Sequence, residues 1–193
     1  HAIIGEIGKD HDPVQKVTLI PRGQAKGLTW FSPDEDQMLV SKAQLKARIM
    51  GALGGRAAED IVFGDGEVTT GAGSDIQQVA SMARQMVTKF GMSDLGPVSL
   101  EGDSQEVFLG RDLMTRNDVS DAISRQIDEQ VRQMVKHCYK EALSIIKDNR
   151  DAMDKLVDVL IEKETIDGDE FCQILSRFTS IPKKEQTVPV LNV

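Results

Sequence analysis

The apolar side chains of this sequence change their spacing near residue 41, and this change limits the folds that the chain can adopt. Before it, β-branched and apolar residues are enriched and partly alternate in Val14–Ile20, and a second such run spans Gly27–Phe31. Pro21-Arg22-Gly23 interrupts the chain between the two runs. After Ser41 the apolar residues recur at helical spacing. The sequence therefore predicts a mainly α-helical fold with a small β-hairpin or sheet over residues 14–31.

Two sequence patterns mark where helices are expected to begin. Ser41 with Gln44, and Ser74 with Gln77, each form a capping-box pattern. The first predicts one helix that continues to a stop near Gly64, and its glycines at 51, 54 and 55 indicate close packing against another element. The second predicts a helix whose apolar stripe runs from 76 to 90, with Gly91 at its C-terminal end.

Residues 92–117 are predicted to be loop with at most one short helix, and the chain after them to be mainly helical. A long helix is expected from about Ser120 to Asn149, and another after Asp151. Thr165–Gly168 is predicted to be a turn, and Asp169–Phe178 a final short helix. We expect one domain over residues 1–181, with the sheet in residues 1–117 and a C-terminal helical part in 118–181. Residues 182–193 are expected to form a flexible tail.

Composition excludes some classes of function. The 193 residues carry a net charge of −8 and only 4% aromatic residues, which disfavours binding to nucleic acid. The sequence contains no run of about 18 apolar residues that would span a membrane. Cys138 and Cys172 have no metal-type spacing, and they are expected to be buried, reduced thiols.

Three features could carry chemistry. Asp75 follows a glycine-rich loop at a helix start, where an acid either complements the helix dipole or binds a metal. Glu59 and Arg56 could form a solvated face or an internal ion pair. His1, considered alone, is an exposed chain start, whereas His11 and His137 are expected at the surface or partly packed.

Together these segments resemble the protease domain of the FtsH-type AAA metalloproteases. The resemblance covers five stretches and nearly the whole chain: His1–Gly5, Val14–Phe31, Gly54–Gly64, Val68–Phe90 and Glu164–Leu175. Two stretches, Asp12–Lys16 and Gly27–Phe31, resemble the photosynthetic branch of cyanobacteria and plastids. The implied fold is a helical zinc-metalloprotease domain, truncated here at the N-terminus of its His-Glu-x-x-His helix.

The resemblance implies a zinc site. In the family, two histidines four residues apart bind Zn²⁺ and the glutamate between them is the general base. His1 matches the second histidine and Asp75 the third ligand, while Glu59 is expected to orient a ligand or hold Arg56. As written, the chain starts after the first histidine and the catalytic glutamate, so these 193 residues alone are expected to bind zinc weakly or not at all and to be inactive.

The resemblance also implies a setting. ATP and Mg²⁺ would bind an upstream AAA module, and an N-terminal anchor would hold a homo- or hetero-hexamer at the membrane. The substrates would be unfolded or damaged proteins, docked on the edge strand formed by Gly27, Leu28, Thr29, Trp30 and Phe31. The alternative for this segment is an ordinary paired strand with Trp30 in a core. The photosynthetic resemblance implies the thylakoid, with this domain on the stromal or cytoplasmic side. The alternatives are a helical ring-forming oligomerisation module without activity and a catalytically dead relative.

Overall fold

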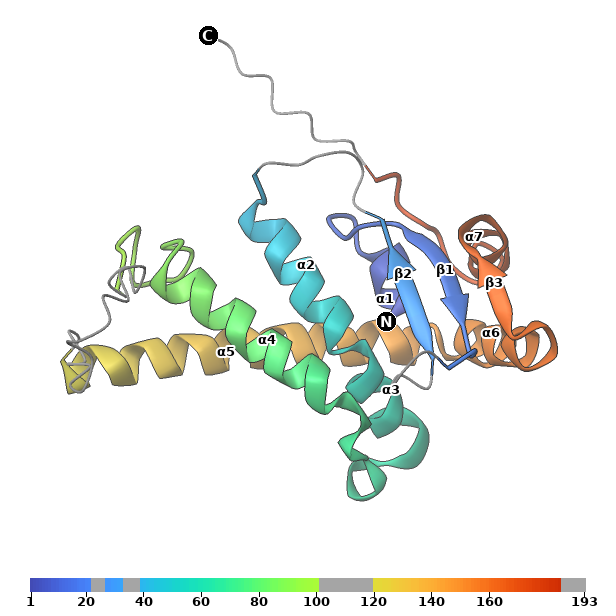
Figure 1. The fold of residues 1–193 in the computed structure, drawn as a ribbon, viewed down its shortest axis with the longest axis horizontal. Coiled ribbons are helices and arrows are strands. Elements are labelled where there is room, and N and C mark those ends of the chain that lie inside the picture. Colours follow the sequence, from blue (N-terminus) through green and yellow to red (C-terminus); the bar gives the residue numbers. More distant parts are fainter. Residues whose placement is uncertain (22–26, 33–38, 101–119, 185–193) are drawn as a thin grey trace, which may run out of the picture.

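The computed structural model describes residues 1–21, 27–32, 39–100 and 120–184. Its longest element is the 28-residue helix α5 (Asp121–Asp148), which extends about 42 Å and serves as the axis of the molecule (Figure 1). Ser120 caps α5 by accepting a hydrogen bond from the Ile123 amide. Three helices pack on α5: α2 (Lys42–Ala52), α3 (Gly54–Phe63) and α4 (Gly73–Thr88).

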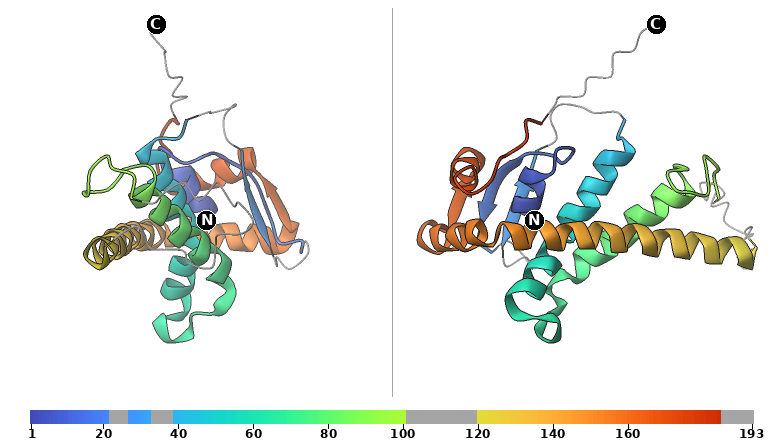
Figure 2. Two further views of the ribbon diagram at one scale, coloured as in Figure 1. Left: turned by 60° about the vertical axis from the view of Figure 1, so that its left-hand side comes forward. Right: turned by 180° about the vertical axis from the view of Figure 1, so that it is seen from behind.

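A small sheet lies at the C-terminal end of α5 (Figure 2). Its three antiparallel strands are β1 (Val14–Thr18), β2 (Leu28–Phe31) and β3 (Thr165–Asp167), in the order β2-β1-β3. The short helix α1 (Ala2–Ile7) packs against β1, α2 and α5, while α6 (Arg150–Lys163) and α7 (Gly168–Leu175) pack near β3. The predicted class, mainly α-helical with a small sheet, is confirmed.

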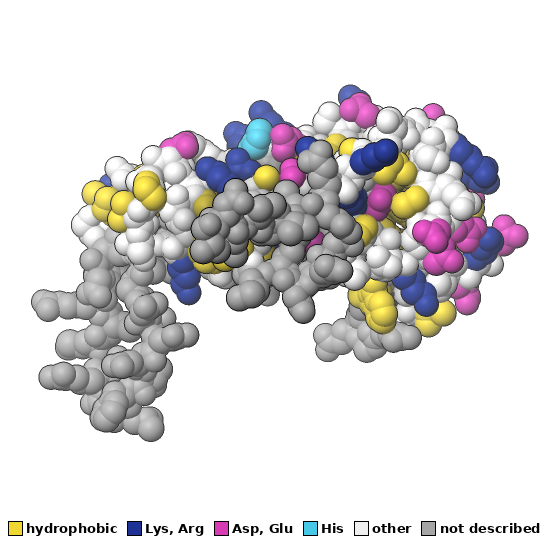
Figure 3. Space-filling view, turned by 90° about the horizontal axis from the view of Figure 1, so that it is seen from above, with side chains coloured by type: hydrophobic (Ala, Val, Ile, Leu, Met, Phe, Trp, Pro, Cys, Tyr) yellow, Lys and Arg dark blue, Asp and Glu magenta, His cyan; other side chains and the backbone are white. Residues whose placement is uncertain are grey.

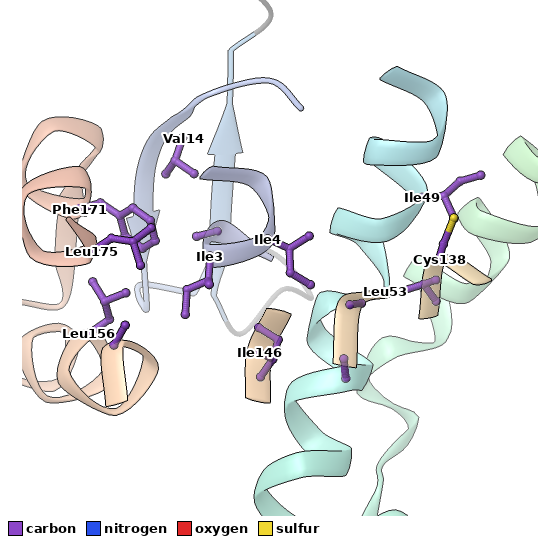
Figure 4. Close-up of a cluster of buried hydrophobic side chains, with 14 of the residues drawn as sticks. Ile3, Ile4, Val14, Ile49, Leu53, Cys138, Ile146, Leu156, Phe171 and Leu175 are labelled. Carbon is purple, nitrogen blue, oxygen red and sulfur yellow. The ribbon is translucent and has the colours of Figure 1, made fainter. Parts of the chain in front are cut away.

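One buried cluster joins the helices to the sheet. Figure 4 shows its members converging from α1, β1, α2, α5, α6 and α7. Ile4, Ile49, Ile146 and Leu175 are each at most 1% exposed, and Phe171 is 2% exposed. Because these side chains come from both ends of the chain, the core fixes α1 relative to the other helices.

The predicted helix after Ser41 is wrong in its extent. The Ser41–Gln44 capping box is present, but Leu53 separates α2 from α3. The chain is closely packed at this break, where a Cβ on Gly54 would lie 2.9 Å from the His1 backbone nitrogen. The glycines there do reflect close approach, as predicted.

The start of the next helix also differs from the prediction. A 3₁₀ turn, η2 (Thr70–Ala72), leads directly into α4, so Ser74 lies inside the helix and caps nothing. The buried apolar stripe of this helix is shorter than predicted, because Ile76 and Phe90 are 43% and 51% exposed. Gly91 adopts the left-handed φ of 59° as the chain leaves α4.

Two further predictions need correction. Residues 165–167 form β3 instead of a turn, since Thr165, Ile166 and Asp167 pair with β1. His11 is buried, with 7% of its surface exposed, and stacks edge-on against Phe31 at a ring-centroid distance of 4.6 Å.

Acidic and basic side chains are interspersed on the face shown in Figure 3. Among the described helices, none is both long enough and apolar enough to cross a membrane. Residues 101–117 and 185–193, part of the predicted loop region and most of the predicted tail, lie outside the described residues.

Candidate metal centre

His1 is held at the N-terminal end of α1. Its carbonyl accepts the Gly5 amide at 2.9 Å, which closes the first turn of the helix. Its Nδ1 lies 2.9 Å from the carbonyl oxygen of Gly51. A carbonyl oxygen only accepts, so Nδ1 carries a proton, and in the neutral imidazole the lone pair is then on Nε2. Main-chain contact with α2 therefore sets the tautomer of this imidazole.

Asp75 faces the free nitrogen of His1. The distance from Nε2 to the Asp75 carboxylate oxygen is 3.6 Å, and the two side chains are 34% and 35% exposed. A lone pair and a carboxylate repel each other at this distance unless a positive charge, such as a proton or a metal cation, lies between them. The arrangement suits a cation that binds both atoms.

Glycines make room for the imidazole. A Cβ on Gly55 would lie 2.7 Å from His1 Nε2 and 3.0 Å from Cε1. Both are shorter than ordinary van der Waals contact, so a larger residue at position 55 would push the ring from its place. The His1 imidazole therefore packs against the first turn of α3.

Glu59 holds the loop that leads to Asp75. Its carboxylate accepts hydrogen bonds from the Thr69 amide at 2.9 Å and from the Thr69 hydroxyl at 2.7 Å. These bonds lower the pKa of Glu59, with the Arg56 charge a smaller contribution in the same direction. The Thr69 hydroxyl in turn accepts the Gly71 amide and caps η2. Glu59 therefore orders the turn before α4 through Thr69.

The geometry fits zinc in part. Zinc bonds of about 2.0–2.2 Å at tetrahedral angles place two ligand atoms about 3.4 Å apart, close to the observed 3.6 Å. Imidazole nitrogen and carboxylate oxygen are both common zinc ligands. In the described ranges, however, no group of three or more His, Cys, Asp and Glu side chains is arranged to bind a metal. His1 and Asp75 together offer two donor atoms, fewer than a zinc site requires.

The strand predicted to dock substrate lies at an edge. Within the described residues β2 pairs with β1 alone, leaving its other side for a further strand. Gly27 precedes the strand, which begins at Leu28. Trp30 is 50% exposed, so the alternative that it fills a core is wrong.

Sequence reasoning missed a polar cluster behind α1. Glu6 is 5% exposed and accepts the Val14 amide at 3.0 Å. The Lys184 ammonium lies 3.2 Å from the same carboxylate oxygen. Nearby, burial lowers the pKa of His11. No spacing in the sequence pointed to these contacts, because Lys184 and Glu6 are 178 residues apart.

Comparison with known proteins gives the family context. A family model described as Peptidase family M41 matches residues 1–174. The chain is 59% identical over 189 residues to "ATP-dependent zinc metalloprotease FTSH 2, chloroplastic" of Arabidopsis thaliana, covering 98% of this chain and 27% of that protein. It is 53% identical over 185 residues to "ATP-dependent zinc metalloprotease FtsH" of Trieres chinensis, covering 95% of this chain and 29% of that one. The chain therefore spans less than a third of the length of these relatives.

Proposed function

This chain belongs to peptidase family M41 and is the peptidase domain of an FtsH zinc metalloprotease, and on that premise we propose that His1 and Asp75 are two of its zinc ligands. The observation that carries the proposal is the 3.6 Å approach of His1 Nε2 to the Asp75 carboxylate. The Nδ1 contact with the Gly51 carbonyl supports it, because a second hydrogen bond of this kind orients metal-binding imidazoles.

The reaction of this class is hydrolysis of peptide bonds. Bound zinc lowers the pKa of water so that hydroxide is available near neutral pH. In the proposed site, His1 and Asp75 hold the metal, and Glu59 keeps the Asp75 loop in place through Thr69. The remaining histidine ligand and the general-base glutamate would come from the residues that precede His1 in a longer chain.

Substrate would bind along β2. An extended peptide could add along the edge of β2 that faces away from β1, as in β-augmentation. Phe31, at the end of this strand, packs on α1 close to Gly5, which ties the docking strand to the helix that carries His1. Unfolded or damaged proteins suit such a site, because only an extended backbone can pair with a strand edge.

The wider assembly is part of the same proposal. Both relatives named above are described as ATP-dependent, and the one from Arabidopsis thaliana is described as chloroplastic. We accordingly place this domain in a membrane-anchored, ATP-driven hexamer of the thylakoid, facing the stroma or cytoplasm, with ATP and Mg²⁺ bound by an upstream module.

The test uses the longer protein that contains the residues preceding His1. Asp75→Asn keeps the size of the side chain but removes its charge, and Asp65→Asn is the matched control on an exposed acid of the 3₁₀ turn η1 (Asp65–Glu67). We expect Asp75→Asn to lose bound zinc and chelator-sensitive casein cleavage, while Asp65→Asn retains both. Full zinc content and cleavage in Asp75→Asn would refute the ligand assignment.

A second experiment addresses the 193 residues alone. With two ligands in the described part of the chain, a protein of only these residues should bind zinc weakly and not cleave casein. Zinc content after dialysis measures this, and near-stoichiometric metal would contradict it. If the longer protein forms hexamers but never cleaves casein, the oligomerisation alternative replaces the peptidase proposal.

A further inference from the structure

Lys184, the last residue that the structure describes, contacts the N-terminal helix α1. Lys184 donates to the Gly5 carbonyl at 2.9 Å, and its ammonium lies 3.2 Å from a Glu6 carboxylate oxygen and 3.4 Å from the Asp12 carbonyl. Its side chain is only 14% exposed, although the neighbouring Lys183 is exposed. Lysine is rarely buried unless it is paired, so this placement indicates a defined contact.

The contact falls on the helix that carries His1. Gly5 and Glu6 lie in the last turn of α1, where carbonyl oxygens have no partner within the helix and a cation is favoured by the helix dipole. The Gly5 amide donates to the His1 carbonyl at 2.9 Å. Gly5 therefore bonds to both residues: its amide donates to His1, and its carbonyl accepts from Lys184.

The same ammonium also fixes α1 to the sheet. Glu6 accepts the amide of Val14, the first residue of β1, with the oxygen that faces Lys184. A six-residue helix is unstable alone, so its position depends on contacts of this kind.

We propose that Lys184 is a positioning residue for the metal centre: from the C-terminal segment it caps α1 and thereby holds the His1 imidazole toward Asp75. This inference rests on the proposed zinc function of His1 and Asp75. It adds a residue that lies 183 positions from His1 in the sequence.

The experiment compares Lys184→Met with Lys183→Met in the longer protein. Both remove one positive charge, but only the first removes the contacts to Gly5 and Glu6. We expect Lys184→Met to bind zinc about 10- to 100-fold more weakly in chelator competition, as for other residues that orient ligands. It should lower kcat for casein with little change in KM, and speed amide hydrogen exchange at Gly5. Lys183→Met should match the wild type in zinc affinity, in kcat and KM, and in amide exchange at Gly5.

A double variant separates positioning from a merely structural role. Lys184→Met leaves the Glu6 carboxylate buried without its cation, which destabilises the fold by itself. Adding Glu6→Gln removes that charge, so stability to urea should recover while zinc affinity stays low, because the Gly5 carbonyl is still uncapped. Recovery of zinc affinity in the double variant would overturn the inference, as would a Lys184→Met protein with wild-type zinc affinity.

Failure of the proposed function gives a different result. If the wild-type longer protein binds no zinc, the function of His1 and Asp75 is refuted. The role of Lys184 in holding α1 is then decided by amide exchange at Gly5: faster exchange in Lys184→Met than in Lys183→Met supports it, and equal exchange overturns it.

Discussion

The substitution Gly55→Ala isolates the placement of His1 from the stability of the fold. The new Cβ would lie 2.7 Å from His1 Nε2, whereas ordinary contact begins near 3.4 Å, so the ring must move by about 0.7 Å. Metal–ligand distances tolerate deviations of about 0.2 Å. The shift is therefore more than three times what a zinc site accepts, and it also strains the 2.9 Å contact between Nδ1 and the Gly51 carbonyl.

The energetic consequences point in opposite directions. A side chain can move away from the new methyl group at little cost to the fold, and alanine in a helix is favoured over glycine by up to about 1 kcal/mol. Stability should thus be unchanged or slightly higher. Zinc affinity should fall about 10- to 100-fold, equivalent to about 1.4–2.7 kcal/mol of binding free energy.

Two measurements on the longer protein test this prediction. Competition with a chromophoric chelator gives zinc affinity, and urea unfolding gives stability. Gly73→Ala is the matched control, because Gly73 is also helical and a Cβ there would meet nothing within 4 Å. Wild-type zinc affinity in folded Gly55→Ala, or equal losses in both variants, would refute the placement of His1 over Gly55.

Three other predictions concern burial. Burial lowers the pKa of His11 below 6.5, so the unfolded chain binds a proton at pH values where the folded chain does not. The contribution of His11 to stability is therefore complete above about pH 6.5 and is lost as the pH falls toward the lowered pKa. Urea unfolding at about pH 7.5 and 5.5 should show a smaller difference in His11→Asn than in wild type, and equal differences would contradict the assignment. Burial raises the pKa of the Cys138 and Cys172 thiols to about 11, so alkylation by iodoacetamide near neutral pH should be slow until urea unfolds the protein; rapid modification of both in the folded state would be inconsistent with this environment. Phe171→Ala should cost about 3–5 kcal/mol of unfolding free energy, and Phe178→Ala much less because Phe178 is 46% exposed, so similar losses would show that the core is misplaced.

Periodicity was sufficient to predict the elements stabilised by local contacts and a buried face. The long helix α5 begins after Ser120, as predicted, and buries Ile127, Cys138, Ala142 and Ile146 at helical spacing. β3 could not be predicted in this way, because Thr165–Asp167 becomes a strand only by pairing with β1 about 150 residues earlier. The close approach of the His1 backbone to Gly54 is likewise a contact between residues far apart in the sequence.

The ligand candidates were predicted by motif, and their orientation was not. His1 and Asp75 were named from the sequence, and the structure brings them together. The Gly51 carbonyl that sets the imidazole tautomer belongs to the main chain, which no residue pattern identifies. Glu59 was expected to orient a ligand or hold Arg56, and its hydrogen bonds are with Thr69, whose place beside α3 depends on the path of the intervening turn.

Different contacts stabilise the domain and orient its two proposed metal ligands. The core around Phe171 and Ile146 is nearly inaccessible to water and dominates the free energy of folding. The Asp75 loop instead depends on hydrogen bonds to Glu59 that are exposed to water, where exchange with solvent makes each bond individually weak. Loss of Glu59 should consequently leave the fold intact while Asp75 samples positions away from His1. A chain of this kind can lose its metal site by substitutions that a stability measurement does not detect.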